Sequence, residues 1–290
     1  MMIDIIILTK GKTDYLFKCL SSILNKTERS TYHIYVCDTG STAKELDIIE
    51  NFIQKNFKKL KNISLLKFSY YNFAKINNYV VENYCKNDTI LFCNNDIELI
   101  DNCIDEMYNV VSSMKNVGTV GCRLLFPDGT VQHAGQLGGV GNEKDTLMFT
   151  HRGIGTKNVY TGLEGVLGST AGFMMIKRDI FLRGGLFSEK YIECFEDLEL
   201  NIRLLLDGYN NMYLDNVSAT HYESLTRGKS PADASRMRFD WDNNLIPYIR
   251  SLSAGDIGKI VTATNPGTRD KSINYDNKIY NKVRDMEVSQ

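Results

Sequence analysis

The alternation of short apolar runs with helical patterns over the first 115 residues constrains the fold of this chain most. Apolar runs at 3–8, 32–37, 63–68 and 89–93 have the length of strands. Strands that are apolar along their whole length are typical of parallel sheets covered on both faces. Between the runs, apolar residues follow helical spacing. The pattern predicts an α/β fold: an open, twisted, doubly wound and mostly parallel sheet with right-handed crossovers and helices on both faces.

The pattern changes near residue 116. Fifteen of the 22 glycines fall between residues 118 and 185. The stretch 135–168 has little periodicity, and we expect a long mobile surface loop there. Regular structure should return in three segments: a strand over 173–176, a helix from Glu196 to Gly208 and a strand over 212–220.

Composition and charge narrow the class of protein. Apolar residues make up 43% of the 290 residues and charged residues 24%, and the net charge is −1. These values are typical of a globular protein and create no field that would attract nucleic acid or an anionic membrane. No apolar run reaches about 18 residues, so we expect no membrane span, and the first residues lack a basic signal region. The seven cysteines are scattered and form no Cys-x-x-Cys pair, so we expect reduced core thiols in a cytoplasmic protein.

The fourth apolar run ends abruptly in the polar segment Asn94-Asn95-Asp96, which carries an acidic side chain. In open α/β sheets, ligands bind at the carboxyl ends of the strands. Mg²⁺ and Mn²⁺ prefer oxygen ligands, and Mg²⁺ often takes only one or two carboxylates besides phosphate oxygens. Asp96 is therefore a candidate metal ligand, and a cap on a following helix is the structural alternative.

Asp38 holds the same position after the second run. Its carboxylate could accept a hydrogen bond from a nucleotide base or a ribose, or it could close an Asx turn with Gly40 and Ser41. The two interpretations stay open on the sequence alone. The chain has neither a P-loop nor a G-x-G-x-x-G after a strand, so neither a P-loop NTPase nor a dinucleotide dehydrogenase is supported.

Three more candidates lie downstream. Glu196 and Asp197 open a predicted helix, where the helix dipole favours carboxylates. One of the two could cap the helix while the other faces a cleft as a general base. His221 ends a predicted strand, and a lone histidine is more often structural than a ligand. A partner such as Asp96 would change that interpretation.

In this order, these segments resemble the family 2 glycosyltransferases, which have the GT-A fold. Two blocks, 71–78 and 128–135, are most similar to bacterial O-antigen, capsule and rhamnan glycosyltransferases. The other blocks that carry the resemblance are 5–9, 15–23, 36–42, 92–98, 195–204 and 221–228.

The resemblance implies a GT-A domain over 1–230. Its nucleotide-binding half would be 1–115, and its acceptor-binding half, with a small mixed region, would be 116–230. Residues 231–290 would be a C-terminal helical extension and tail. The glycine-rich stretch would then border the acceptor cleft.

The resemblance also implies roles for individual residues. Asp96 and His221 would bind Mn²⁺ or Mg²⁺, which bridges the diphosphate of the donor. Asp197 would be the base that deprotonates the acceptor hydroxyl in an inverting single displacement, with Glu196 and His133 near the acceptor or supporting. The residues implied for nucleotide binding are Thr9, Asp38, Lys75, Asn94, Asn95 and Arg227.

The implied substrates are a UDP-, dTDP- or GDP-sugar and a glycan or lipid-linked acceptor, in surface polysaccharide synthesis. The protein would act in the cytoplasm, and association with the inner face of the membrane stays open. The chain departs from the family pattern at Asn94, which stands at the first acidic position of Asp-x-Asp. An amide brings no charge, so we expect weak metal affinity without the donor.

Three other functions share parts of this pattern. A sugar-phosphate nucleotidyltransferase also combines an α/β fold with acidic metal ligands, although residues 9–12 are a poor version of its glycine-rich basic loop. A glycosidase uses paired carboxylates and needs no nucleotide. A non-catalytic GT-A-like binding module would not require Asp96, Asp197 and His221 together.

Overall fold

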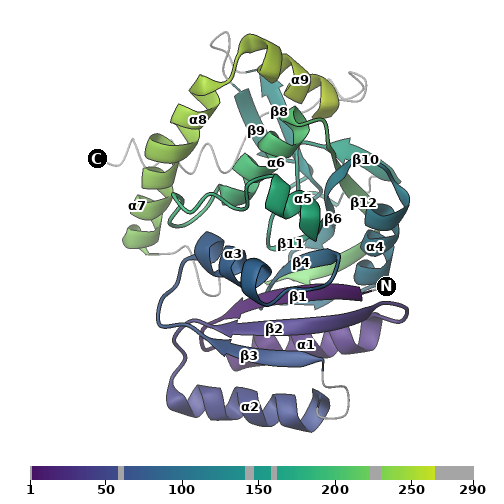
Figure 1. Ribbon diagram of the computed structural model, residues 1–290, viewed down its shortest axis with the longest axis vertical. Coiled ribbons are helices and arrows are strands. Elements are labelled where there is room, and N and C mark those ends of the chain that lie inside the picture. The colour runs from purple at the N-terminus through teal and green to yellow at the C-terminus, as the bar shows by residue number, and fades with distance from the viewer. Residues whose placement is uncertain (1, 58–61, 141–146, 158–161, 223–229, 265–290) are drawn as a thin grey trace.

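The computed structural model describes residues 2–57, 62–140, 147–157, 162–222 and 230–264, and a large sheet with helices on both faces dominates it (Figure 1). The strands are β1 (Met2–Thr9), β2 (Thr31–Asp38), β3 (Ile63–Lys67), β4 (Thr89–Asn94), β5 (Ile97–Leu99), β6 (Val117–Leu125), β7 (Val131–His133), β8 (Gln136–Val140), β9 (Leu147–His151), β10 (Leu163–Val166), β11 (Phe173–Lys177) and β12 (Asn210–His221). The helices are α1 (Thr13–Lys26), α2 (Ala43–Phe57), α3 (Phe73–Asn83), α4 (Cys103–Ser113), α5 (Arg178–Arg183), α6 (Glu196–Leu206), α7 (Pro231–Asp240), the π-helix η1 (Trp241–Leu245), α8 (Ile246–Ser251) and α9 (Ala254–Thr264).

Among the described residues the sheet has ten strands, and its main path runs β3-β2-β1-β4-β11-β6-β12-β10. Off this path, β5 pairs with β12 and β7 pairs with β6. The first four strands of the main path are parallel. β11 is antiparallel to both β4 and β6, whereas β12 is parallel to β6. β4, β6 and β12 therefore point the same way, and their carboxyl ends meet at one edge. The predicted open, mostly parallel α/β sheet is confirmed.

Both faces of the sheet are buried, which explains the continuous apolar strands. In β1, Ile3, Ile5 and Ile7 pack in the core formed with α1, α2 and α4. Ile6, between them, packs in the opposite core, with α3, α5 and α6. Neighbouring residues of a strand point to opposite faces of the sheet. A strand that is buried on both faces therefore needs apolar residues at odd and even positions.

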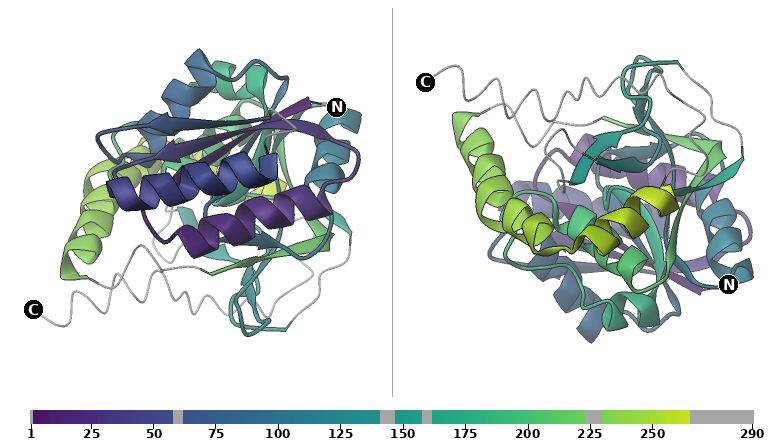
Figure 2. Two further views of the ribbon diagram at one scale, coloured as in Figure 1. Left: turned by 90° about the horizontal axis from the view of Figure 1, so that it is seen from below. Right: turned by 90° about the horizontal axis from the view of Figure 1, so that it is seen from above.

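The C-terminal helices pack on the side of α6 that faces away from the sheet. Leu198 and Ile202 of α6 share a buried cluster with Leu245 of η1 and with residues of α8 and α9. Figure 2 shows α7, α8 and α9 running together along this side of the molecule. Of the predicted extension and tail, residues 265–290 lie outside the described residues.

The prediction of one long irregular loop over 135–168 is wrong for the described part of that stretch. β8 and β9 pair as an antiparallel hairpin, and β10 pairs with β12 at the edge of the main sheet. Strand formation here depends on partners distant in the sequence, which override the weak local pattern. Residues 141–146 and 158–161 are outside the described part, and the expected mobility stays a prediction.

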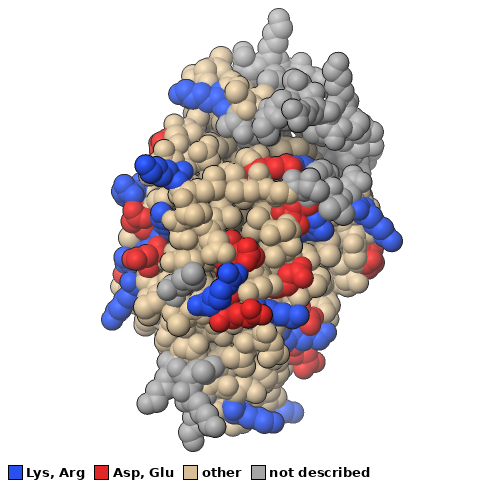
Figure 3. Space-filling model, turned by 90° about the vertical axis from the view of Figure 1, so that its right-hand side faces the viewer, with Lys and Arg blue, Asp and Glu red and all other residues tan. Residues whose placement is uncertain are grey.

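No helix within the described ranges combines the length and the apolar character that crossing a bilayer requires. On the face shown in Figure 3, acidic and basic side chains are interspersed, and neither sign forms a continuous patch.

Candidate active site

Four strands bring the predicted site residues to one edge of the sheet. β1 ends at Thr9, β2 at Asp38, β4 at Asn94 and β12 at His221. β1, β2 and β4 are parallel, and the pairings through β11 and β6 orient β12 the same way. This is the edge where α/β sheets bind ligands.

Asp38 and Thr9 are both buried and already have partners on this edge. The Asp38 carboxylate accepts hydrogen bonds from the backbone N–H of Gly40 (3.1 Å) and of Ser41 (3.2 Å). The Asx turn is therefore formed, but a carboxylate has about four acceptor positions, so it can still accept from a ligand. The Thr9 hydroxyl accepts from the Asn95 amide at 3.0 Å. Thr9 and Asn95 thus form one polar group beside Asp38.

Asp96 and His221 lie together although 125 positions separate their numbers. His221 Nε2 is 3.3 Å from Asp96 Oδ1, and the Asn94 amide nitrogen lies 3.3 Å from the same Nε2. Asp96 is 7% exposed and His221 is 8% exposed. Two ligand atoms, each about 2.1 Å from a shared ion, are separated by about 3 Å. The pair therefore fits one divalent ion.

Gln132 decides which nitrogen of His221 faces Asp96. Its side-chain oxygen lies 2.7 Å from His221 Nδ1. An amide oxygen only accepts, so Nδ1 donates to Gln132, and Nε2 is the ring nitrogen that could ligate an ion. A divalent cation would be held by this Nε2 together with the Asp96 carboxylate, in place of the contact of Nε2 with the Asn94 amide. Within the described ranges no three His, Cys, Asp or Glu side chains gather as a metal site, so the donor phosphates and water would complete the coordination.

We expect Gln132→Leu to lower the affinity for Mn²⁺ about 10- to 100-fold, because outer-shell partners fix the orientation and tautomer of a ligating histidine. Titration with Mn²⁺ in the presence of a bound nucleoside diphosphate measures the change. Gln132→Glu keeps an acceptor at the same place and serves as the control. Equal Mn²⁺ affinity in wild type and the leucine variant would remove Gln132 from the site.

Asp197 stands in the first turn of α6 and is half-buried. Its carboxylate accepts from the backbone N–H of Leu198 at 2.7 Å and from that of Ala171 at 2.9 Å. These two bonds fix the orientation of the carboxylate. The neighbouring Glu196 is buried, with an exposed fraction of 6%. Of the two acids, Asp197 is the more accessible to a substrate.

The segment 167–172 connects Asp197 to Asn94 and was not predicted as part of the site. Ala171 binds Asp197, and the Gly172 carbonyl accepts from the Asn94 N–H at 2.8 Å. A Cβ on Gly172 would lie 3.2 Å from Asn94 Nδ2 and 3.5 Å from His221 Cε1, so the glycine allows a close approach. No local sequence signal marks this segment beyond its glycines.

Two buried asparagines hold that segment in place. Asn201 of α6 donates to the Ser169 carbonyl at 3.0 Å. Asn211 of β12 donates to the Leu167 carbonyl at 2.7 Å and to the Asn201 carbonyl at 2.9 Å. Buried polar groups of this kind are costly unless paired, and once paired they select one arrangement.

His133 is buried and pairs with His151, with 2.9 Å between their Nδ1 atoms. Its Nε2 accepts from the Thr170 N–H at 3.4 Å, next to Ala171. Burial lowers the pKa of His133 well below its ordinary value, and charge on His151, Arg152 or His221 acts in the same direction. His133 is therefore neutral behind the site, and its predicted contact with the acceptor stays a prediction.

This lowered pKa predicts a stability that depends on pH. Unfolded His133 binds its proton near pH 6.5, whereas the folded protein resists protonation until a lower pH. The unfolded state then holds more protons, so stability falls as pH drops below about 6.5, by up to about 1.4 kcal/mol per pH unit. Urea unfolding between pH 5 and 8 measures it. His133→Gln should flatten the dependence more than His33→Gln, because His33, whose pKa burial also lowers, is less buried. Equal slopes in wild type and His133→Gln would contradict this assignment.

Two predicted nucleotide ligands lie apart from this cluster. Lys75 is exposed on the first turn of α3, with Nζ 5.5 Å from the centre of the Tyr70 ring. α3 follows β3, so Lys75 is at the correct edge of the sheet. Arg227 lies outside the described residues.

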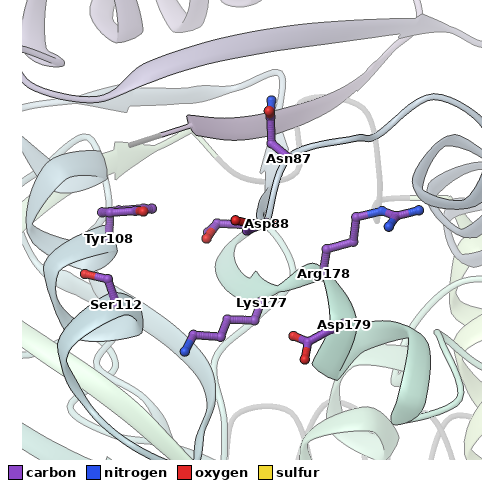
Figure 4. Close-up of a pocket in the computed structure, with 8 residues that line it drawn as sticks. Asn87, Asp88, Tyr108, Ser112, Lys177, Arg178 and Asp179 are labelled. Carbon is purple, nitrogen blue, oxygen red and sulfur yellow. The ribbon is translucent and has the colours of Figure 1, made fainter.

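A cavity of about 530 Å³ lies at the opposite edge of the sheet, where β4 begins and β11 ends. Figure 4 shows Lys177, Arg178 and Asp179 beside Asp88 at this place, with Tyr108 facing them from α4. The acidic and basic residues in the lining balance, and none of the predicted site residues that the structure describes contributes to it. The cavity is separate from the candidate active site.

The sequence matches the family described as Glycosyl transferase family 2 over residues 4–185, more than half of the chain. The chain belongs to this family. The match includes the Asn94-Asn95-Asp96 segment and ends before Asp197 and His221.

Two curated relatives are much longer than this chain. An uncharacterized protein, y4gI, of Sinorhizobium fredii is 30% identical over 248 residues, which cover 82% of this chain and 26% of that protein. The O-antigen biosynthesis protein RfbC of Myxococcus xanthus is 29% identical over 230 residues, which cover 78% of this chain and 18% of that protein. The chain therefore spans about a quarter of one relative and less than a fifth of the other.

Several solved structures share the fold. GalNAc-T7, solved with UDP, GalNAc and Mn²⁺, superposes with a TM-score of 0.64 at 14% identity, covering 90% of this chain and 54% of that one. The mannosyltransferase PcManGT from Pyrobaculum calidifontis, solved with GDP-Man and Mn²⁺, gives 0.62 at 12% identity, covering 90% and 69%. TarS 1-349 of S. aureus gives 0.58 at 14% identity, covering 91% and 70%. The chain has the predicted GT-A fold.

Proposed function

We propose that this protein is a metal-dependent inverting glycosyltransferase. It would move a sugar from a UDP-, dTDP- or GDP-sugar to a hydroxyl of a glycan or lipid-linked acceptor, in surface polysaccharide synthesis. The observation that carries the proposal is the meeting of Asp96 and His221, which a cation would complete, beside a segment that binds Asp197.

Each residue has a chemical task in this proposal. Thr9 and Asp38 present hydrogen-bonding groups to the nucleotide at the ends of β1 and β2. Asp96 and His221 would hold Mn²⁺ or Mg²⁺, which would neutralise charge on the departing nucleoside diphosphate. Asp197 accepts the proton of the acceptor hydroxyl as its oxygen forms the bond to the anomeric carbon. The bond to the diphosphate breaks on the other side of that carbon, which inverts its configuration.

The comparisons support this proposal at the level of reaction class. RfbC of Myxococcus xanthus is described as an O-antigen biosynthesis protein, which favours a polysaccharide product. Two of the solved neighbours hold UDP or GDP-Man together with Mn²⁺, which favours a nucleotide donor and a divalent ion.

A thermal-shift screen tests the proposal directly. We expect UDP, dTDP or GDP, at about 100 times its dissociation constant and with Mn²⁺, to stabilise the protein by about 2.7 kcal/mol, which raises the melting temperature of a chain of this length by about 4 °C. CMP and each nucleotide without Mn²⁺ are the comparisons. The nucleotide that binds selects the donor sugars for transfer assays. A protein that binds no nucleotide with Mn²⁺, or that releases pyrophosphate from a nucleoside triphosphate, would contradict the proposal.

A further inference from the structure

Asp240, the last residue of α7, is fully buried and lies outside the mechanism described so far. Its carboxylate accepts hydrogen bonds from three consecutive backbone N–H groups. The distances are 2.9 Å to Ile192, 2.6 Å to Glu193 and 3.1 Å to Cys194. A buried carboxylate is costly unless it is fully hydrogen-bonded, and bonds from N–H groups to a charged acceptor are among the stronger ones.

The three bonded residues lead directly into the first turn of α6. Phe195 follows them with φ of 79°, a left-handed conformation that is unfavourable for a residue with a side chain. Glu196 and Asp197 come next. A strained residue at a helix start persists only where the surrounding structure holds it. The segment before Asp197 therefore needs an external support.

The helical extension supplies that support through several contacts besides Asp240. The Trp241 ring packs edge-on against Phe195, with 5.7 Å between the ring centres. Asn244 donates to the Lys190 carbonyl at 3.1 Å and to Asp240 at 3.1 Å. Arg236 pairs with Glu193 at 2.8 Å. Residues of α7 and η1 thus hold both the segment 190–194 and the strained residue.

We infer that Asp240 is a positioning residue for Asp197. This inference rests on the proposed function, in which Asp197 is the base. By holding 192–194, Asp240 sets where α6 begins and hence where the Asp197 carboxylate meets the Ala171 N–H. The extension after residue 230 then belongs to the active-site architecture, although the family match ends at residue 185.

Hydrogen exchange of Asp240→Asn tests the inference without any ligand. The side-chain amide nitrogen of the asparagine would face the backbone N–H groups of residues 192–194. Hydrogen bonds to this side chain are then lost with little change in its shape. The amides of Ile192, Glu193 and Cys194 should exchange about 10- to 100-fold faster, and so should those of Ala171 and Leu198, which bind Asp197. The amides of Gly40 and Ser41, held by Asp38, should not change.

Turnover and binding distinguish a positioning role from a general loss of stability. With the donor that the nucleotide screen selects, kcat should fall about 10- to 100-fold in Asp240→Asn while nucleotide affinity with Mn²⁺ stays unchanged. Asp242→Asn is the matched control, since Asp242 belongs to the same extension but is exposed and pairs with Arg238. Asn244→Ala removes a weaker contact to the segment 190–194. It replaces Asp240→Asn in both measurements if Asp240→Asn does not fold.

Each outcome decides the inference. Faster exchange at 192–194 with unchanged exchange at Ala171 and Leu198, or with unchanged kcat, would reduce Asp240 to a structural contact and overturn it. Wild-type exchange throughout would overturn it as well. A wild-type protein that binds no nucleotide would instead contradict the proposed function, and the exchange rates would still show whether Asp240 holds Asp197.

Discussion

Replacing Asp197 by asparagine should lower the rate of sugar transfer about 10²–10⁴-fold, because loss of a general base typically costs that much. The asparagine keeps the shape of the side chain and its acceptor oxygen, but it cannot take the proton of the acceptor hydroxyl. Nucleotide affinity should stay within about twofold, since Asp197 contacts Ala171 and Leu198 and none of the residues at the ends of β1 and β2. Steady-state transfer rates and calorimetric titration with nucleotide and Mn²⁺ measure the two quantities.

Glu196→Gln is the control for this prediction. It changes the neighbouring acid on the same helical turn, which is more deeply buried than Asp197. We expect a smaller loss of transfer from it than from Asp197→Asn. If the asparagine variant transferred sugar at the wild-type rate, Asp197 would not be the base, and Glu196 would be the next candidate.

Asp96→Asn should abolish the dependence of nucleotide binding on Mn²⁺ and lower transfer at least about 100-fold. The reason is that a metal ion contributes several kcal/mol by stabilising charge on the leaving group. Since Asn94 already lacks a charge, Asp96→Asn would leave the ion no anionic protein ligand in the Asn94-Asn95-Asp96 segment. Calorimetric titration with nucleoside diphosphate, with and without Mn²⁺, measures the binding part.

Asp47→Asn is the control, because it removes a carboxylate at an exposed position of α2, away from the site. It should change neither Mn²⁺ dependence nor transfer. Nucleotide binding that responds to Mn²⁺ equally in wild type and Asp96→Asn would show that the meeting of Asp96 and His221 is not a metal site.

The acidic residues can be located from the sequence because their signals are local. Asp38 and Asp96 each follow an apolar run that is long enough for one strand, and Asp197 stands where helical spacing begins. The period of a strand or a helix is read over a few residues, and a parallel sheet places strand ends on one edge whatever lies between them. The predicted parallel half of the sheet therefore agrees closely with β1 to β4.

Local patterns do not reveal a segment that takes its structure from distant partners. β8, β9 and β10 lie in the glycine-rich stretch that we expected as a loop. Their strand character comes from pairing with each other and with β12, and glycines weaken the alternation that would reveal it. The short strand β5, which pairs with the end of β12, gave no signal of its own either.

The sequence by itself determined the α/β class, the carboxyl-edge positions of Asp38 and Asp96, and the acids at the start of α6, because all of these follow from local periodicity. Only the tertiary structure decided that Gln132 orients His221, that the segment 167–172 links Asp197 to Asn94, and that Asp240 holds the residues before Asp197. These contacts join positions 26 to 89 residues apart in the chain. Such pairs meet only when β11 is inserted antiparallel, β12 returns beside β6, and α7 folds back. No local pattern encodes those choices, since they depend on which buried surfaces pack best together.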